Sequence, residues 1–136
     1  LVKRAVARFG ERRTMLAGLC FGVLGSAIYG LAPTGGLFAL GILAGAGVGL
    51  FNPSLQGLMT RAVEPSVQGQ LQGATGSLQG LTGLVGPGLF SFTFASFIGA
   101  RAPWHMPGAP FLLSGLLTLM ALLLGWQVTR RRAAGP

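Results

Sequence analysis

The chain has 136 residues, of which 51% are hydrophobic and only 9% are charged. Soluble domains carry about 25% charged residues, so this composition excludes an ordinary water-exposed fold, and the high hydrophobic share excludes a glycine-rich disordered segment. The net charge of +8 does not indicate nucleic-acid binding, because the basic residues flank long apolar runs instead of forming a basic face on a folded domain.

The first segment, residues 1–13, reads LVKRAVARFGERR and is both basic and amphipathic. It does not begin with Met, and no signal peptide precedes the first apolar run, so we expect the chain to be part of a longer protein or to lack its start. We predict that residues 1–13 form a cytoplasmic loop whose cations attract anionic lipid headgroups.

The first two transmembrane helices are predicted at residues 14–32 and 37–60. Residues 14–32 carry no charge and would span about 28 Å as a helix, close to the ~30 Å hydrocarbon core of a bilayer. Both helices carry glycines at the spacing of a close-packing face: Gly18, Gly22 and Gly25 in the first, and Gly41, Gly45 and Gly49 in the second. Asn52-Pro53 interrupts the second helix, so we predict a kink with a local polar spot there.

The third predicted helix, residues 68–98, carries two stripes at helical spacing. The polar stripe consists of Gln68, Gln72, Thr75, Gln79 and Thr82. The glycine stripe follows one position later and consists of Gly69, Gly73, Gly76, Gly80 and Gly83. A helix that faced only lipid would need neither stripe, so we expect it to pack inside a bundle and to border a polar pathway. Gly86-Pro87-Gly88 predicts a kink farther along.

Five uncharged polar residues are the candidates for lining that pathway. They are Asn52, Gln56, Gln72, Gln79 and Thr82. Such side chains either hydrogen-bond a substrate or bridge neighbouring helices, and the sequence leaves both roles open.

The last predicted helix covers residues 110–129, and residues 130–136 form a tail that begins with three arginines. Nine of the ten basic residues fall in the first segment, the middle connection and the tail, which lie on one side if four helices span the membrane. The positive-inside rule therefore places both ends in the cytoplasm. The predicted fold is an all-α, polytopic membrane protein.

Enzyme chemistry is not expected. The two carboxylates lie in the cytoplasmic connections, and His105 is the one histidine, so we expect no metal site, no cofactor and no catalytic constellation. No charge lies inside the four predicted spans, so any proton relay would depend on groups in another part of the protein.

The hexapeptide RFGERR, residues 8–13, resembles the cytoplasmic loop motif of the major facilitator superfamily in its second-half copy. This resemblance implies that Arg8, Gly10, Arg12 and Arg13 are motif residues. The stretch NPSLQGLMTRAVEPSVQGQLQG, residues 52–73, followed by LTGLVGPGLF, is similar to the tetracycline/proton antiporter family of drug efflux transporters. Lys3 and Ala7 replace the usual Gly and Asp of the loop motif, and Gly22 stands where tetracycline exporters tend to carry an acidic residue.

The resemblance covers nearly the whole chain and implies that residues 1–136 are the C-terminal part of a twelve-helix transporter, its helices nine to twelve. It further implies export of tetracycline-like or other drug-like molecules in exchange for protons, across a bacterial inner membrane. The implied partners are the lipid bilayer, the missing N-terminal helices and a small-molecule substrate. The rival hypothesis is a small membrane interaction protein or a non-transporting remnant; a pore-forming peptide fits less well, since the helices lack strongly amphipathic faces.

Overall fold

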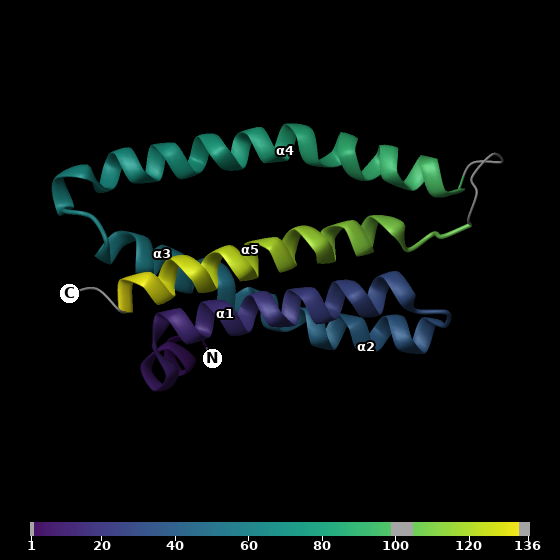
Figure 1. Ribbon diagram of the computed structural model, residues 1–136, viewed down its shortest axis with the longest axis horizontal. Coiled ribbons are helices and arrows are strands. Elements are labelled where there is room, and N and C mark those ends of the chain that lie inside the picture. The colour runs from purple at the N-terminus through teal and green to yellow at the C-terminus, as the bar shows by residue number, and fades with distance from the viewer. Residues whose placement is uncertain (1, 99–104, 134–136) are drawn as a thin grey trace.

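The computed structural model describes residues 2–98 and 105–133, and within these ranges the chain is helical, without strands. Figure 1 shows the helices in order. They are α1 (Val2–Leu31), α2 (Gly35–Gly45), the 3-10 segment η1 (Ala46–Leu50), α3 (Phe51–Arg61), the 3-10 turn η2 (Pro65–Val67), α4 (Gln68–Ile98) and α5 (Ala109–Ala133). Four stretches are long and apolar enough to cross a membrane: Arg4–Leu31, Gly35–Arg61, Pro65–Ile98 and Ala109–Arg130. The predicted all-α, polytopic membrane fold is therefore confirmed.

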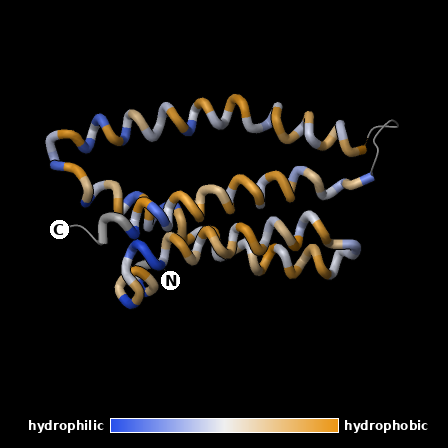
Figure 2. The backbone as a smooth tube through the Cα atoms, in the orientation of Figure 1, coloured by the Kyte–Doolittle hydropathy of each residue, from blue (hydrophilic) through white to orange (hydrophobic). Residues whose placement is uncertain are grey.

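Helix α1 lies at the centre of the packing. It contacts α2, η1 and α3 on one side and α5 on another, whereas α4 contacts α5 and no residue of α4 is buried. Figure 1 accordingly shows α4 on the side of α5 that faces away from α1 and α2. Figure 2 shows hydrophilic residues gathered at the end of the bundle where α1 begins and where α3 and α5 end.

Residues 2–13, which the sequence predicts as a cytoplasmic loop, are helical, and this helix is part of α1. The helix is broken at Gly10, whose backbone angles are φ 79° and ψ 160°. Residues 2–9 consequently turn away from the rest of α1, as Figure 1 shows for the purple end of the chain. This backbone region is open almost only to glycine, so the glycine of the loop motif is what allows the bend.

Replacing Gly10 by Ala is expected to destabilise the protein by about 1–3 kcal/mol, because a Cβ is strained at these backbone angles even with no neighbour nearby. The measurement is the thermal midpoint of the purified protein in mild detergent. Gly35→Ala is the matched control, since Gly35 has ordinary backbone angles and open space around it. Equal midpoints for the two variants would show that the bend at Gly10 is not fixed.

The second membrane span departs from regular α-helix, but the departure lies about one turn before the kink predicted at Asn52-Pro53. The 3-10 segment η1 covers Ala46–Leu50, and regular helix resumes at Phe51, before Pro53. A proline ring displaces the carbonyl of the residue four positions earlier, which here is Gly49 inside η1. The distortion therefore lies ahead of the proline and not at the Asn52-Pro53 pair itself.

In the second half, α4 has its predicted range, whereas α5 begins one residue earlier and ends four residues later than predicted. α4 runs from Gln68 to Ile98 as predicted and continues through Pro87, and Figure 1 shows it as a curved helix. Proline is tolerated inside membrane helices, where it bends them without ending them. α5 continues to Ala133, so the arginines after Thr129 end the apolar run but not the helix, because arginine is a good helix former. Residues 99–104, between α4 and α5, lie outside the described residues, as do residues 134–136.

The glycine face of α1 is confirmed as a close-packing surface. A Cβ at Gly18 would lie 2.8 Å from the backbone nitrogen of Phe51, and one at Gly25 would lie 2.8 Å from the Cα of Gly45. Gly22 is buried against side chains of α5 and η1. Of the matching glycines on the second span, a Cβ at Gly41 would lie 2.9 Å from the Tyr29 ring, whereas one at Gly49 would have no described neighbour from another part of the chain within 4 Å. Small residues therefore set the approach of α1 to α2 and α3.

Ser54 is the one fully buried side chain among the residues that the structure describes, and its Oγ has no hydrogen-bond partner there. A buried, unsatisfied hydroxyl costs about 1–3 kcal/mol. Ser54→Ala is therefore expected to leave the thermal midpoint unchanged or to raise it, with the exposed Ser66→Ala as control. A lower midpoint for Ser54→Ala alone would mean that the hydroxyl has a partner, such as a water molecule or another helix.

Candidate functional site

The structure brings together two of the five candidate pathway residues. The amide nitrogen Nε2 of Gln72 on α4 donates to Oε1 of Gln56 on α3 over 3.2 Å. This bond joins two consecutive membrane helices near the connection between them. The sequence left open whether these side chains bind a substrate or bridge helices. In this structure Gln56 and Gln72 bridge α3 and α4.

The other three candidates do not join this pair. Asn52 is exposed on α3, and Gln79 and Thr82 are exposed on α4. The hydroxyl of Thr82 donates to the backbone carbonyl of Gln79 over 2.9 Å, which is a local bond within the helix. In the described part of the chain, the side-chain amides of Asn52 and Gln79 make no hydrogen bond. Their assignment to a substrate pathway stays a prediction.

The glycine stripe of α4 is open along its whole length. None of the described residues lies within 4 Å of the position that a Cβ would take at Gly69, Gly73, Gly76, Gly80 or Gly83. The expected close packing of this stripe therefore stays a prediction, and its partner would lie outside the described chain. Both missing transporter helices and another membrane protein would fit such a face.

The loop motif ties three helices together at one end of the bundle. Glu11, which follows the Gly10 bend, forms an ion pair with Arg61 at the end of α3, with Oε1 and Nη2 3.2 Å apart. Arg12 donates from Nε to Oγ1 of Thr129 at the end of α5 over 2.8 Å. The motif therefore fixes the ends of α3 and α5 to the start of the α1 membrane span.

The remaining motif residues behave differently. Arg8 and Arg13 are exposed, and the described residues offer them no ion pair.

Sequence reasoning missed the partners Glu11, Arg61 and Thr129. A signal was present, because Glu11 is one of two carboxylates in a chain with ten basic residues and a lone acid beside a membrane span is rarely left unpaired.

Among the hollows between the described helices, two are lined by residues of α1. One, of about 310 Å³, has hydroxyl groups from α1 and α5 in its wall and is lined by Gly22, Ser26, Tyr29, Gly45, Val48, Ser114 and Thr118. Sequence analysis missed this hollow, although Ser26 and Tyr29 continue the spacing of the α1 glycines. The other, of about 410 Å³, is an apolar cleft between α1, α3 and α5, with Arg12 and Thr129 in its wall.

Metal-binding groups are sparse in the described residues. They contain no cluster of three or more His, Cys, Asp or Glu side chains that could hold an ion. Cys20 and His105 are both exposed and lie on different parts of the fold.

Taken together, four membrane-spanning helices, close glycine packing and uncharged polar side chains define a polytopic α-helical membrane protein. The profile of the Major Facilitator Superfamily matches residues 1–135. The chain belongs to the major facilitator superfamily.

The chain is similar to tetracycline resistance proteins and to Hippocampus abundant transcript-like proteins. It is 32% identical to the tetracycline resistance protein, class C, of Escherichia coli, over 87% of this chain and 28% of that protein. It is 32% identical to the class H protein of Pasteurella multocida, over 91% of this chain and 30% of that protein. It is 28% identical to the Hippocampus abundant transcript-like protein 1 of Rattus norvegicus, over 98% of this chain and 29% of that protein. The chain thus spans less than a third of the length of these relatives. No solved structure matches it significantly.

Proposed function

We propose that this chain forms the C-terminal four helices of a secondary active efflux transporter that exports drug-like small molecules in exchange for protons. The observation that carries the proposal is the similarity to tetracycline resistance proteins across nearly the whole chain, within a shared superfamily. The chemistry of the chain fits this role, because its membrane spans carry uncharged hydrogen-bonding groups in place of catalytic ones.

The chain supplies one part of such a transporter. Alternating access needs two halves of the protein that rock around a site near the middle of the membrane. Five open glycines on α4 offer a smooth surface on which further helices would pack closely. The ion pair of Glu11 with Arg61 and the bond of Arg12 to Thr129 would keep α1, α3 and α5 together as a unit during that motion.

The substrate is proposed only as a class. Relatives named for tetracycline resistance favour a drug-like molecule with several hydrogen-bonding groups, which glutamine amides suit well. No charged residue lies within residues 14–32, 37–60, 68–98 or 110–129, so proton-binding groups would be supplied by other helices of the same protein.

We place both ends of the chain on the cytoplasmic side of a bacterial inner membrane. Nine of ten basic residues support this orientation, since they lie at the ends of the spans that share one side. An alkaline phosphatase fused after α5, which is active only outside the cytoplasm, would be inactive in this orientation. An active fusion would refute it.

Transport is tested by expressing the complete gene in an efflux-deficient bacterium and measuring its susceptibility to a panel of drugs that includes tetracycline. We expect resistance to at least one compound to rise, and a protonophore to abolish the difference in drug accumulation. A well-produced protein that changed neither susceptibility nor accumulation for any compound would favour the membrane interaction protein instead.

A further inference from the structure

The smaller of the two hollows, of about 310 Å³, lies where α1 and α5 meet η1 and the end of α2. We name it the hydroxyl hollow, because four of the residues that line it carry a hydroxyl group: Ser26, Tyr29, Ser114 and Thr118. The other lining residues are Gly22, Gly45 and Val48. None of these residues is charged, so the wall of the hollow is polar without being ionic.

Three of the four hydroxyl groups have no hydrogen-bond partner among the described residues. Most serine and threonine hydroxyls of the described helices donate to a backbone carbonyl one turn earlier, as Thr118 does to Ser114 over 2.8 Å. The side-chain hydroxyls of Ser26, Tyr29 and Ser114 make no such bond. Lipid tails offer no hydrogen bond in its place, and an unpaired hydroxyl is unfavourable at membrane depth. The three groups therefore indicate an occupant that both donates and accepts hydrogen bonds.

The hydroxyl of Tyr29 is held at the hollow by the packing of its ring. The ring centre lies 4.7 Å from that of Phe38 and 5.3 Å from that of Phe111. A Cβ at Gly41 would lie 2.9 Å from the ring, whereas one at Gly45 would lie 3.5 Å from the hydroxyl oxygen. The ring therefore packs along α2 and places its hydroxyl beside Gly45, in the wall of the hollow.

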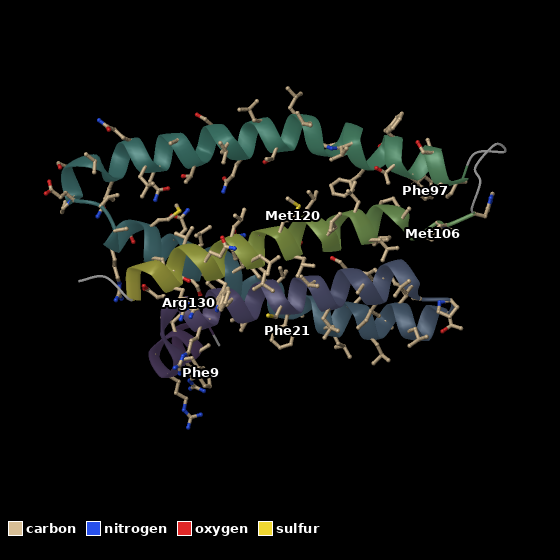
Figure 3. All side chains as sticks on the ribbon, in the orientation of Figure 1. Phe9, Phe21, Phe97, Met106, Met120 and Arg130 are labelled. Carbon is tan, nitrogen blue, oxygen red and sulfur yellow. The ribbon has the colours of Figure 1, made fainter. Side chains whose placement is uncertain are left out.

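The hydroxyl hollow lies deep in the membrane span, on the α1 side of α5. Ser26 follows Arg13, the last charged residue before it, by thirteen positions, or about 20 Å along a helix. Thr118 faces α1, because its methyl carbon would lie 3.1 Å from a Cβ at Gly22. Figure 3 shows Met120 on the other side of α5, toward α4. The hollow is therefore separate from the polar stripe of α4.

Water is the occupant that suits this wall. A water molecule needs two to four polar partners, and each hydroxyl group offers both a donor and acceptor lone pairs. One water molecule needs roughly 10–15 Å³ of such space, so several fit in about 310 Å³. An ion would lack a charged partner here, and a lipid tail would leave the hydroxyls unpaired.

We propose that the hydroxyl hollow binds a cluster of water molecules within the membrane. The water molecules donate to and accept from the hydroxyls of Ser26, Tyr29 and Ser114. They thereby bridge α1 and α5 at membrane depth, as the bond from Arg12 to Thr129 bridges the same helices at the basic end of the bundle. This proposal does not depend on transport.

The test measures how fast cysteines in the hollow react with a water-soluble reagent. Ser26→Cys and Ser114→Cys are made in the protein produced from its complete gene, with all other cysteines removed, Cys20 included. Each variant is placed in lipid nanodiscs and treated with 2-aminoethyl methanethiosulfonate. The reagent reacts with the thiolate, which forms readily in water and poorly in hydrocarbon. We expect both cysteines to be modified.

Leu24→Cys and Leu116→Cys are the matched controls. Each lies two positions from a serine of the hollow and hence on the opposite side of its helix at the same depth. Leu24 is 52% exposed and Leu116 is 56% exposed, so access to the side chain itself is not limiting. The cysteines in the hollow should react roughly tenfold faster or more. Equal rates at all four positions, or unreactive cysteines in the hollow, would overturn the proposal.

X-ray radiolytic footprinting of the wild type tests the same proposal without any substitution that could disturb folding. An X-ray pulse converts bound water into hydroxyl radicals, which modify the side chains next to that water. After correction for intrinsic reactivity, we expect Tyr29 to be modified faster than Phe92, which is 73% exposed on α4 but lies outside the hollow. Equal or slower modification of Tyr29 would overturn the proposal.

Discussion

Gly25→Val is expected to abolish correct folding of the protein. A Cβ at this position would lie 2.8 Å from the Cα of Gly45 and 2.9 Å from its nitrogen, so the added atoms meet backbone and not a flexible side chain. The two helices can accommodate valine only by moving apart, which would also separate α2 from Tyr29, whose ring packs over Gly41. Overpacking typically costs about 1–3 kcal/mol and more where backbone must move, as here, which is a large share of the roughly 5–15 kcal/mol that stabilises a typical domain.

The measurement is fluorescence-detected size-exclusion chromatography of the tagged protein in mild detergent. We expect the monodisperse peak of the wild type to be lost in Gly25→Val and kept in Gly36→Val. The latter is a matched control because Gly36 lies on the same helix pair, in the first turn of α2, with open space around its Cβ position. If the two variants gave the same profile, the close contact of α1 and α2 would not exist in the folded protein.

Under the proposed efflux function, Gln79→Leu is expected to remove most of the drug resistance that the complete gene would confer. The amide of Gln79 is exposed on α4 and makes no hydrogen bond to the described residues, so it is free to bind another group. A hydrogen bond to substrate contributes about 0.5–1.5 kcal/mol, so its loss should reduce efflux up to roughly tenfold. Leucine has a similar size and suits a membrane helix, and the variant should therefore fold.

The control is Gln127→Leu, the same chemical change at an exposed position on α5. Resistance would be compared at equal protein levels in the membrane, as judged by immunoblot. Resistance lost in Gln79→Leu and kept in Gln127→Leu would place the polar stripe of α4 on the transport pathway. Unchanged resistance in both would mean that the stripe only bridges helices, as the bond between Gln56 and Gln72 does.

Much of the fold could be predicted from the sequence because a membrane span imposes strong local rules. Uncharged runs set the number of helices, and α4 begins at Gln68 and ends at Ile98 as its hydropathy predicts. The glycine spacing of α1 also predicted a packing face, since close helix contact in membranes depends on small residues. These features depend on composition within one segment, which a single sequence displays directly.

Features that depend on contacts between segments could not be predicted in the same way. Glu11 and Arg61 form an ion pair across fifty positions, and only the packing of α1 against α3 brings them together. The bond between Gln56 and Gln72 likewise depends on how the chain turns between α3 and α4. The bend at Gly10 was missed because a basic, amphipathic stretch gives no periodic signal for a break in a helix.

The central claim, proton-driven export, is tested most directly by drug flux into everted inner-membrane vesicles that contain the protein produced from its complete gene. We predict that tetracycline, or another compound to which the gene is found to confer resistance, accumulates when respiration acidifies the vesicle lumen and that a protonophore releases it. Vesicles without the gene should show neither effect. Accumulation that was absent despite abundant folded protein, or that persisted without a proton gradient, would contradict proton-driven export.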